Sequence, residues 1–153
     1  MARGVVFFGR DLALYSARVA TFIFKTEPGE YSFDDLVRDR AAVWEGVSSP
    51  AALAHLRTAR KGDAVLVYHT GNERSIVGLA AITRDPYPDP KLDDPRRVVV
   101  DLKPGKRAPT PVTLQTIKAD PRFKDFALVK QGRLSVIPVP AQLDTVLRSL
   151  AGL

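Results

Sequence analysis

The stretch FKTEPGEYSFDDLVRDR, residues 24–40, takes the chain from a strand into a helix. The residues at its start belong to ATFIFK, residues 20–25, in which β-branched and aromatic side chains favour a strand. Pro28 has no backbone N–H to give to a sheet, so the strand is expected to end before it. We therefore predict that Lys25 and Thr26 lie at the end of this strand with hydrogen-bond donors left free.

Two helix starts carry recognisable capping chemistry. Ser32 stands three residues before Asp35, which is the spacing of a capping box, and predicts a helix over residues 33–38. Ser49 is a second candidate cap, followed by Pro50 at the first helical position, where proline is favoured. This second helix is expected to continue until Lys61-Gly62 closes it.

The rest of the chain predicts further strands separated by loops. Residues 64–70 and 75–83 are expected to pair as a hairpin. Four prolines in residues 84–95 predict a loop, after which a strand resumes over residues 96–103 and stops at Pro104-Gly105. The remaining predicted elements are one or two short helices within 110–129, a strand at 132–139 and an amphipathic helix at 140–150.

This order of elements predicts an α+β fold. Helices do not alternate regularly with strands, which favours a curved, mostly antiparallel sheet or small barrel of five to six strands with short helices around it. The chain has 153 residues, enough for one domain with a single core, which we place at residues 21–153. Residues 1–20 lack the features of a signal peptide and are expected to form a loosely held extension.

Composition narrows the class of partner. Lysine and arginine number 23 against 17 aspartates and glutamates, a net charge of +6, which is the sign expected of a protein that binds phosphate backbones. The apolar runs are too short to cross a membrane. The chain has no cysteine, two histidines and no metal-binding or nucleophile motif, so we predict no catalytic residue, metal or cofactor. A cytoplasmic monomer is expected.

Trp44, the one tryptophan, stands in the loop-like sequence VWEGV, residues 43–47. It is either a core anchor, as most tryptophans are, or a platform on which a flat heterocycle stacks. Gly46 would let the backbone approach the same ligand closely.

Other candidate residues lie at strand ends. Tyr68 and His69 precede a turn, where side chains open onto the rim of a sheet, although strand alternation alone would also explain them. Arg133 and Ser135 share one face of a predicted strand and could hold a phosphate or a base edge. A plain surface arginine is the other interpretation.

Several of these segments, taken in order, resemble the EVE domain family of the PUA-like superfamily. The similarity covers about residues 21–150 and rests on seven motifs: FKTEP at 24–28, YSFDDL at 31–36, VWEGV at 43–47, KGDAVLVYHT at 61–70, IVGLAAI at 76–82, YPDP at 87–90 and LVKQGRLSVIPV at 128–139.

The resemblance implies a PUA-like barrel with a pocket for one modified base. Related YTH domains take a methylated base into an aromatic cage. The residues implied to form the pocket are Lys25, Thr26, Trp44, Gly46, Val47, Ser49, Tyr68, His69, Arg133, Leu134 and Ser135. The family commonly has Arg-Asn where this chain has Ser48-Ser49, and some of its usual aromatic residues are replaced. Whether Tyr87 substitutes for one of them is left open.

The sequence thus predicts a non-catalytic nucleic-acid-binding module that holds a modified cytosine or adenine of DNA or RNA. Two alternatives remain. One is an enzyme acting on a nucleotide or small heterocycle, with His69 or a carboxylate as general base. The other is a small-molecule or protein-interaction module.

Overall fold

The computed structural model describes residues 19–153, so the predicted extension, residues 1–20, lies almost wholly outside the described residues. The strands are β1 (Thr21–Thr26), β2 (Ala42–Trp44), β3 (Ala64–His69), β4 (Ser75–Pro88), β5 (Val98–Thr113) and β6 (Val136–Pro138). The helices are α2 (Phe33–Asp39), α3 (Pro50–Leu56), α4 (Leu114–Ala119), the 3₁₀ turn η1 (Pro121–Phe123), α5 (Ala127–Lys130) and α6 (Ala141–Ala151).

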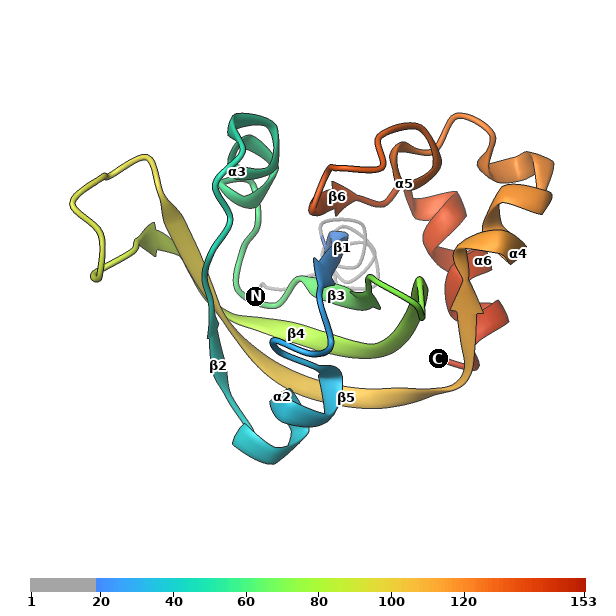
Figure 1. The fold of residues 1–153 in the computed structure, drawn as a ribbon, viewed down its shortest axis with the longest axis horizontal. Coiled ribbons are helices and arrows are strands. Elements are labelled where there is room, and N and C mark those ends of the chain that lie inside the picture. The colour runs from blue at the N-terminus through green and yellow to red at the C-terminus, as the bar shows by residue number, and fades with distance from the viewer. Residues whose placement is uncertain (1–18) are drawn as a thin grey trace, which may run out of the picture.

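The six strands form one curved sheet in the order β2-β5-β4-β3-β1-β6 (Figure 1). Only β1 and β3 run parallel, and the other neighbouring pairs are antiparallel. The predicted α+β class, with a mostly antiparallel sheet of five to six strands and short helices, is confirmed. Closure of the sheet into a barrel stays a prediction.

Strands β4 and β5 are the longest strands of the sheet, and both are longer than predicted. The expected loop at residues 84–95 begins as strand, because β4 continues to Pro88, and β5 runs past Pro104-Gly105 to Thr113. Pro86, Pro109 and Pro111 fall at irregularities in the pairing, where not every backbone N–H is needed. Residues 108–111, for example, which include Pro109 and Pro111, stand opposite the single residue Val77 between the pairs Gly78↔Arg107 and Ile76↔Val112.

Both predicted helix caps are confirmed. Ser32 accepts a hydrogen bond from the Asp35 N–H, and the Asp35 side chain accepts one from the Ser32 N–H. Ser49 caps α3 by accepting from the Ala52 N–H at 3.2 Å. The predicted end of α3 is wrong: the helix stops at Leu56, and the chain up to Gly62 forms turns.

Two further predictions need correction. The predicted strand at 132–139 is short, because β6 covers only Val136–Pro138 and the residues before it form a turn. Trp44 does not stand in a loop, since it is the last residue of β2 and pairs with Val100 of β5. This pairing holds Trp44 at the edge of the sheet, above the buried ring of Phe24 in β1.

Candidate functional site

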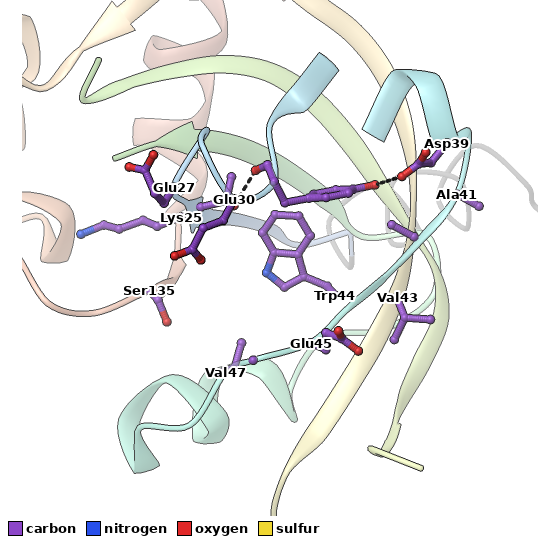
Figure 2. Close-up of a pocket in the computed structure, with 14 residues that line it drawn as sticks. Lys25, Glu27, Glu30, Asp39, Ala41, Val43, Trp44, Glu45, Val47 and Ser135 are labelled. Atoms are coloured by element: carbon purple, nitrogen blue, oxygen red, sulfur yellow. Dashed lines mark hydrogen bonds between the residues drawn. The ribbon is translucent and has the colours of Figure 1, made fainter. Parts of the chain in front are cut away.

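A cavity of about 660 Å³ opens between the end of β1 and strand β2 (Figure 2). A cavity of this size is typical of small-ligand sites. Its walls are three chain segments and one residue that precedes β6. The lining residues are Lys25, Thr26, Glu27, Glu30, Tyr31, Asp39, Ala41, Ala42, Val43, Trp44, Glu45, Gly46, Val47 and Ser135.

Trp44 serves both as a core anchor and as a wall of this cavity. Its side chain is buried, with a relative exposure of 8%, and its ring centroid lies 5.7 Å from that of Phe24. The core-anchor interpretation is therefore confirmed. The same indole borders the cavity and points from its strand toward Glu30 (Figure 2). Trp44 thus packs against the core through Phe24 and also lines the cavity.

Tyr31 is a second aromatic wall that the sequence did not predict as a site residue. Its ring meets the Trp44 indole edge-on, with centroids 6.3 Å apart. The Tyr31 hydroxyl donates to Asp39 Oδ2 at 2.9 Å. Burial, followed by this hydrogen bond, raises the pKa of Tyr31 to about 12. Its sequence signal is its place in the motif YSFDDL, which predicts a helix cap.

Lys25 and Thr26 line the cavity, but their side-chain donors are not free as predicted. Lys25 Nζ donates to the Gly132 carbonyl at 2.9 Å and lies 5.7 Å from the centre of the Tyr68 ring. Burial lowers the pKa of Lys25. Thr26 Oγ1 donates to the Tyr31 carbonyl at 2.6 Å, which holds the turn that carries the Tyr31 ring.

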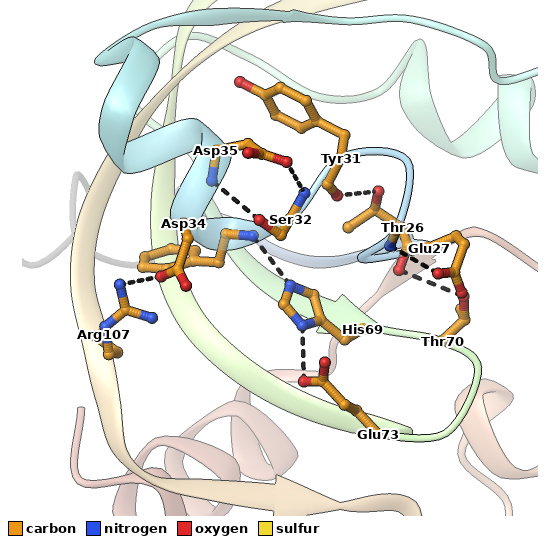
Figure 3. A network of polar contacts seen from close by, with 12 residues as sticks. Thr26, Glu27, Tyr31, Ser32, Asp34, Asp35, His69, Thr70, Glu73 and Arg107 are labelled. Atoms are coloured by element: carbon orange, nitrogen blue, oxygen red, sulfur yellow. Dashed lines mark hydrogen bonds and ion pairs between the residues drawn. The ribbon is translucent and has the colours of Figure 1, made fainter.

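Tyr68 and His69 do not open onto a rim, because both are buried and neither borders the cavity. His69 Nε2 accepts a hydrogen bond from the Phe33 N–H at 3.0 Å (Figure 3). Its Nδ1 lies 2.9 Å from Glu73 Oε1, so the neutral ring donates there. His69 thus holds the start of α2 against β3.

The remaining predicted residues divide between two cavities. Gly46, Val47 and Ser135 line the Trp44 cavity. Ser49, Arg133 and Leu134 instead line a separate cavity of about 400 Å³. Arg133 is exposed and has no hydrogen bond or ion pair with another described residue.

Carboxylates dominate the polar lining of the Trp44 cavity, an unexpected finding in a chain of net charge +6. The lining carboxylates are Glu27, Glu30, Asp39 and Glu45, and Lys25 is the one cation among the lining residues. Asp39 is also paired with Arg38, and Glu45 with Lys91. Such a wall accepts hydrogen bonds and disfavours an anionic group inside the cavity. It suits a flat ligand with amino donors better than it suits a phosphate.

The structure also bears on metal sites and on membrane-spanning helices within residues 19–153. In that range no three His, Cys, Asp or Glu side chains are grouped so as to hold a metal ion. No helix in the same range is long and apolar enough to cross a membrane.

Sequence and structure comparisons agree on the family. The model of the EVE domain matches residues 20–149. The chain is 28% identical over 111 residues to thymocyte nuclear protein 1 of Gallus gallus, which covers 69% of this chain but only 46% of that protein. The chain therefore spans less than half the length of this relative.

Solved structures have the same fold. Rpa0253 from Rhodopseudomonas palustris superposes with a TM-score of 0.83 at 40% identity, covering 88% of this chain and 94% of that one. The human THYN1 protein, solved in complex with DNA containing 5-methylcytosine, gives a TM-score of 0.80 at 23% identity, with coverage of 86% and 97%. From the family match and the 40% identical structure, the chain belongs to the EVE domain family.

Proposed function

We propose that this EVE domain is a non-catalytic nucleic-acid-binding module that receives one modified base, a modified cytosine or adenine, in the Trp44 cavity. The observation that carries the proposal is the corner formed by Trp44 and Tyr31 in a cavity walled by carboxylates. An aromatic wall stacks on a base, and stacking contributes about 1–3 kcal/mol per base. The human THYN1 complex with 5-methylcytosine DNA supports a nucleic acid as the partner.

The charge of the wall favours bases that carry an exocyclic amino group. Cytosine offers its N4 amino group and adenine its N6 amino group as donors, and a carboxylate is the natural acceptor. Glu30 has no hydrogen bond or ion pair with another described side chain and borders the cavity near Trp44 (Figure 2). It is the carboxylate best placed to accept from such a group. Thymine and uracil lack this donor and should bind less well.

A base inside the cavity must leave its stack, which costs a few kcal/mol. Stacking on Trp44 and Tyr31, together with phosphate contacts outside the cavity, has to offset that cost. Because phosphate contacts release counterions, affinity should fall steeply as salt rises.

The proposal is tested by fluorescence anisotropy with oligonucleotides that differ in one base. DNA and RNA strands would carry 5-methylcytosine or cytosine, and N6-methyladenine or adenine, at the same position. We expect one modified base to bind more tightly than its plain counterpart. Tyr31→Ala should abolish that preference, because it removes a wall without opening the core.

Tyr87→Ala is the matched control. Tyr87 is also a partly buried tyrosine whose hydroxyl donates to a carboxylate, Asp101, but it does not line the cavity. Its replacement should leave the preference intact. Equal affinity for all the strands, unchanged by Tyr31→Ala, would contradict the proposal. Tight binding of a free modified nucleoside, with no gain from the strand, would instead favour a small-molecule module.

A further inference from the structure

A third cavity, of about 320 Å³, adjoins the Trp44 cavity and is lined by three arginines. We call it the arginine pocket, and its polar lining is Arg57, Arg96, Arg97, Asp94 and Ser48. The two cavities meet at consecutive residues, because Val47 lines the first and Ser48 lines the second. Their Cα atoms are only ~3.8 Å apart, as in any trans peptide.

The arginine pocket is strongly cationic. Asp94 is its only carboxylate and is paired with Arg96, at 3.0 Å between Oδ1 and Nε. The other two arginines bond to main-chain carbonyls: Arg57 Nη2 donates to the Arg96 carbonyl at 2.6 Å, and Arg97 Nε donates to the Val47 carbonyl at 3.0 Å. Three guanidinium groups against one carboxylate leave a net charge of +2.

These main-chain bonds also fix the orientation of the Arg57 and Arg97 guanidinium groups. Arg97 reaches across from the start of β5 to the carbonyl of a residue that borders the Trp44 cavity. Each bond uses one N–H group of a guanidinium that carries five. The remaining donors are therefore held in place. A ligand that binds them does so without a further loss of side-chain conformational entropy.

The two neighbouring cavities thus have opposite electrostatic character. The Trp44 cavity has four carboxylates and one lysine, whereas the arginine pocket has three arginines and one aspartate. A nucleotide has the same polarity, since its amino-bearing base donates hydrogen bonds and its phosphate is an anion that guanidinium groups bind with paired N–H donors.

We propose that the arginine pocket binds the backbone phosphate that flanks the base held in the Trp44 cavity. The strand would then cross the chain at Val47-Ser48, with its base on one side and its phosphate on the other. This inference rests on the proposed function for the position of the base. It adds the phosphate-binding residues Arg57, Arg96 and Arg97.

The test compares the salt dependence of binding in three variants. Arg57→Gln removes an exposed guanidinium, and it should weaken binding to modified and plain strands by the same factor. The slope of log K against log salt should become shallower by ~1. Asp94→Asn releases Arg96 from its ion pair while keeping an oxygen for the Arg96 N–H, and it should tighten binding to both strands.

Lys118→Gln is the control for loss of a positive charge. Lys118 is exposed on α4, which lies far from α3 in Figure 1. Its replacement should change neither the slope nor the affinity by the amount expected of Arg57→Gln. Circular dichroism melting curves should confirm that all three variants are as stable as the wild type.

The outcomes separate this inference from the proposed function. A retained preference for the modified base, with Arg57→Gln and Asp94→Asn no different from Lys118→Gln, would overturn the phosphate site and leave the function standing. A shallower slope in Arg57→Gln, with no preference for any modified base, would support the phosphate site and overturn base recognition. No binding of any oligonucleotide would overturn both.

Discussion

The ring of Tyr31 stands at 79° to the indole of Trp44, edge to face, with 6.3 Å between their centroids. Two hydrogen bonds hold Tyr31 in this position, one from Thr26 to its carbonyl and one from its hydroxyl to Asp39. The aromatic corner is therefore built from the end of β1, the turn after it, α2 and β2. Substitutions in and around this corner should therefore change stability or titration measurably.

Trp44 should contribute to stability as well as to binding. Because it is buried against Phe24, Trp44→Ala would leave a cavity and lower the free energy of unfolding by ~3–5 kcal/mol. Urea denaturation would measure this loss. Val43→Ala, at an exposed position of the same strand, should cost less than ~1 kcal/mol. Similar losses in the two variants would show that Trp44 is not a core residue. Binding studies should use Trp44→Phe, which keeps a ring in the core.

Tyr31 should lose its proton at a higher pH than an ordinary tyrosine. Its pKa in the folded protein is raised from the ordinary value of 10.0 to about 12, so the folded state holds the proton more tightly. The resulting stabilisation is present below pH 10 and is lost as the pH rises from about 10 to 12. The tyrosinate absorbance of the wild type minus that of Tyr31→Phe should have its midpoint near 12. A midpoint near 10 would mean that neither burial nor the bond to Asp39 perturbs Tyr31 in the folded protein.

His69 should contribute to stability through its hydrogen bond with Phe33. His69→Ala leaves the buried Phe33 N–H without its acceptor, and an unpaired buried group costs ~1–3 kcal/mol. His55→Ala, at a partly exposed helical site, should change the free energy of unfolding by ~0.5 kcal/mol or less. Urea denaturation of both variants gives the comparison. Equal effects would remove the role assigned to His69 in holding α2.

Local chemistry explains which parts of the fold the sequence could predict. The caps at Ser32 and Ser49 involve residues three positions apart, so they can be recognised without knowledge of the fold. The full length of β5 could not be predicted, because Pro109 and Pro111 fit where β4 and β5 are out of register. Proline in isolation favours a break, and the paired strand overrides that preference.

The candidate site also contains residues that the sequence could predict and residues that it could not. Trp44 was predictable because the one tryptophan stands outside a periodic apolar face, two residues before Gly46. Tyr31 was hidden, since its partner Asp39 lies eight residues away and its other contact is on β2. His69 was misplaced at the rim because its partners, Phe33 and Glu73, are brought to it by the sheet and by α2. The ring of carboxylates around the Trp44 cavity could not be predicted either, because its members come from separate segments that only the fold brings together.

The packing of α2 on the sheet depends on a glycine. A Cβ at Gly78 would lie 2.7 Å from Phe33 Cδ1 and closer still to two other ring atoms. Phe33 is the first residue of α2 and is buried, with Arg107 5.3 Å above its ring and paired with Asp34. Burial and the contact with Arg107 restrict how far the ring can move. Gly78→Ala should therefore lower the free energy of unfolding by ~1–3 kcal/mol, the usual cost of overpacking.

A double-mutant cycle distinguishes this contact from a general effect of alanine in β4. If the clash with Phe33 is the cause, Gly78→Ala should cost less in a Phe33→Leu background, with a coupling energy of at least ~0.5 kcal/mol. Gly132→Ala is the control, because a Cβ there meets no atom within 4 Å. It should be nearly neutral by urea denaturation. An unchanged cost of Gly78→Ala in the Phe33→Leu background would mean that β4 needs glycine for its backbone, since position 78 also lies between two shifts of register with β5. The clash predicts coupling and the backbone explanation predicts none, so the cycle decides which constraint keeps α2 seated beside the Tyr31 turn.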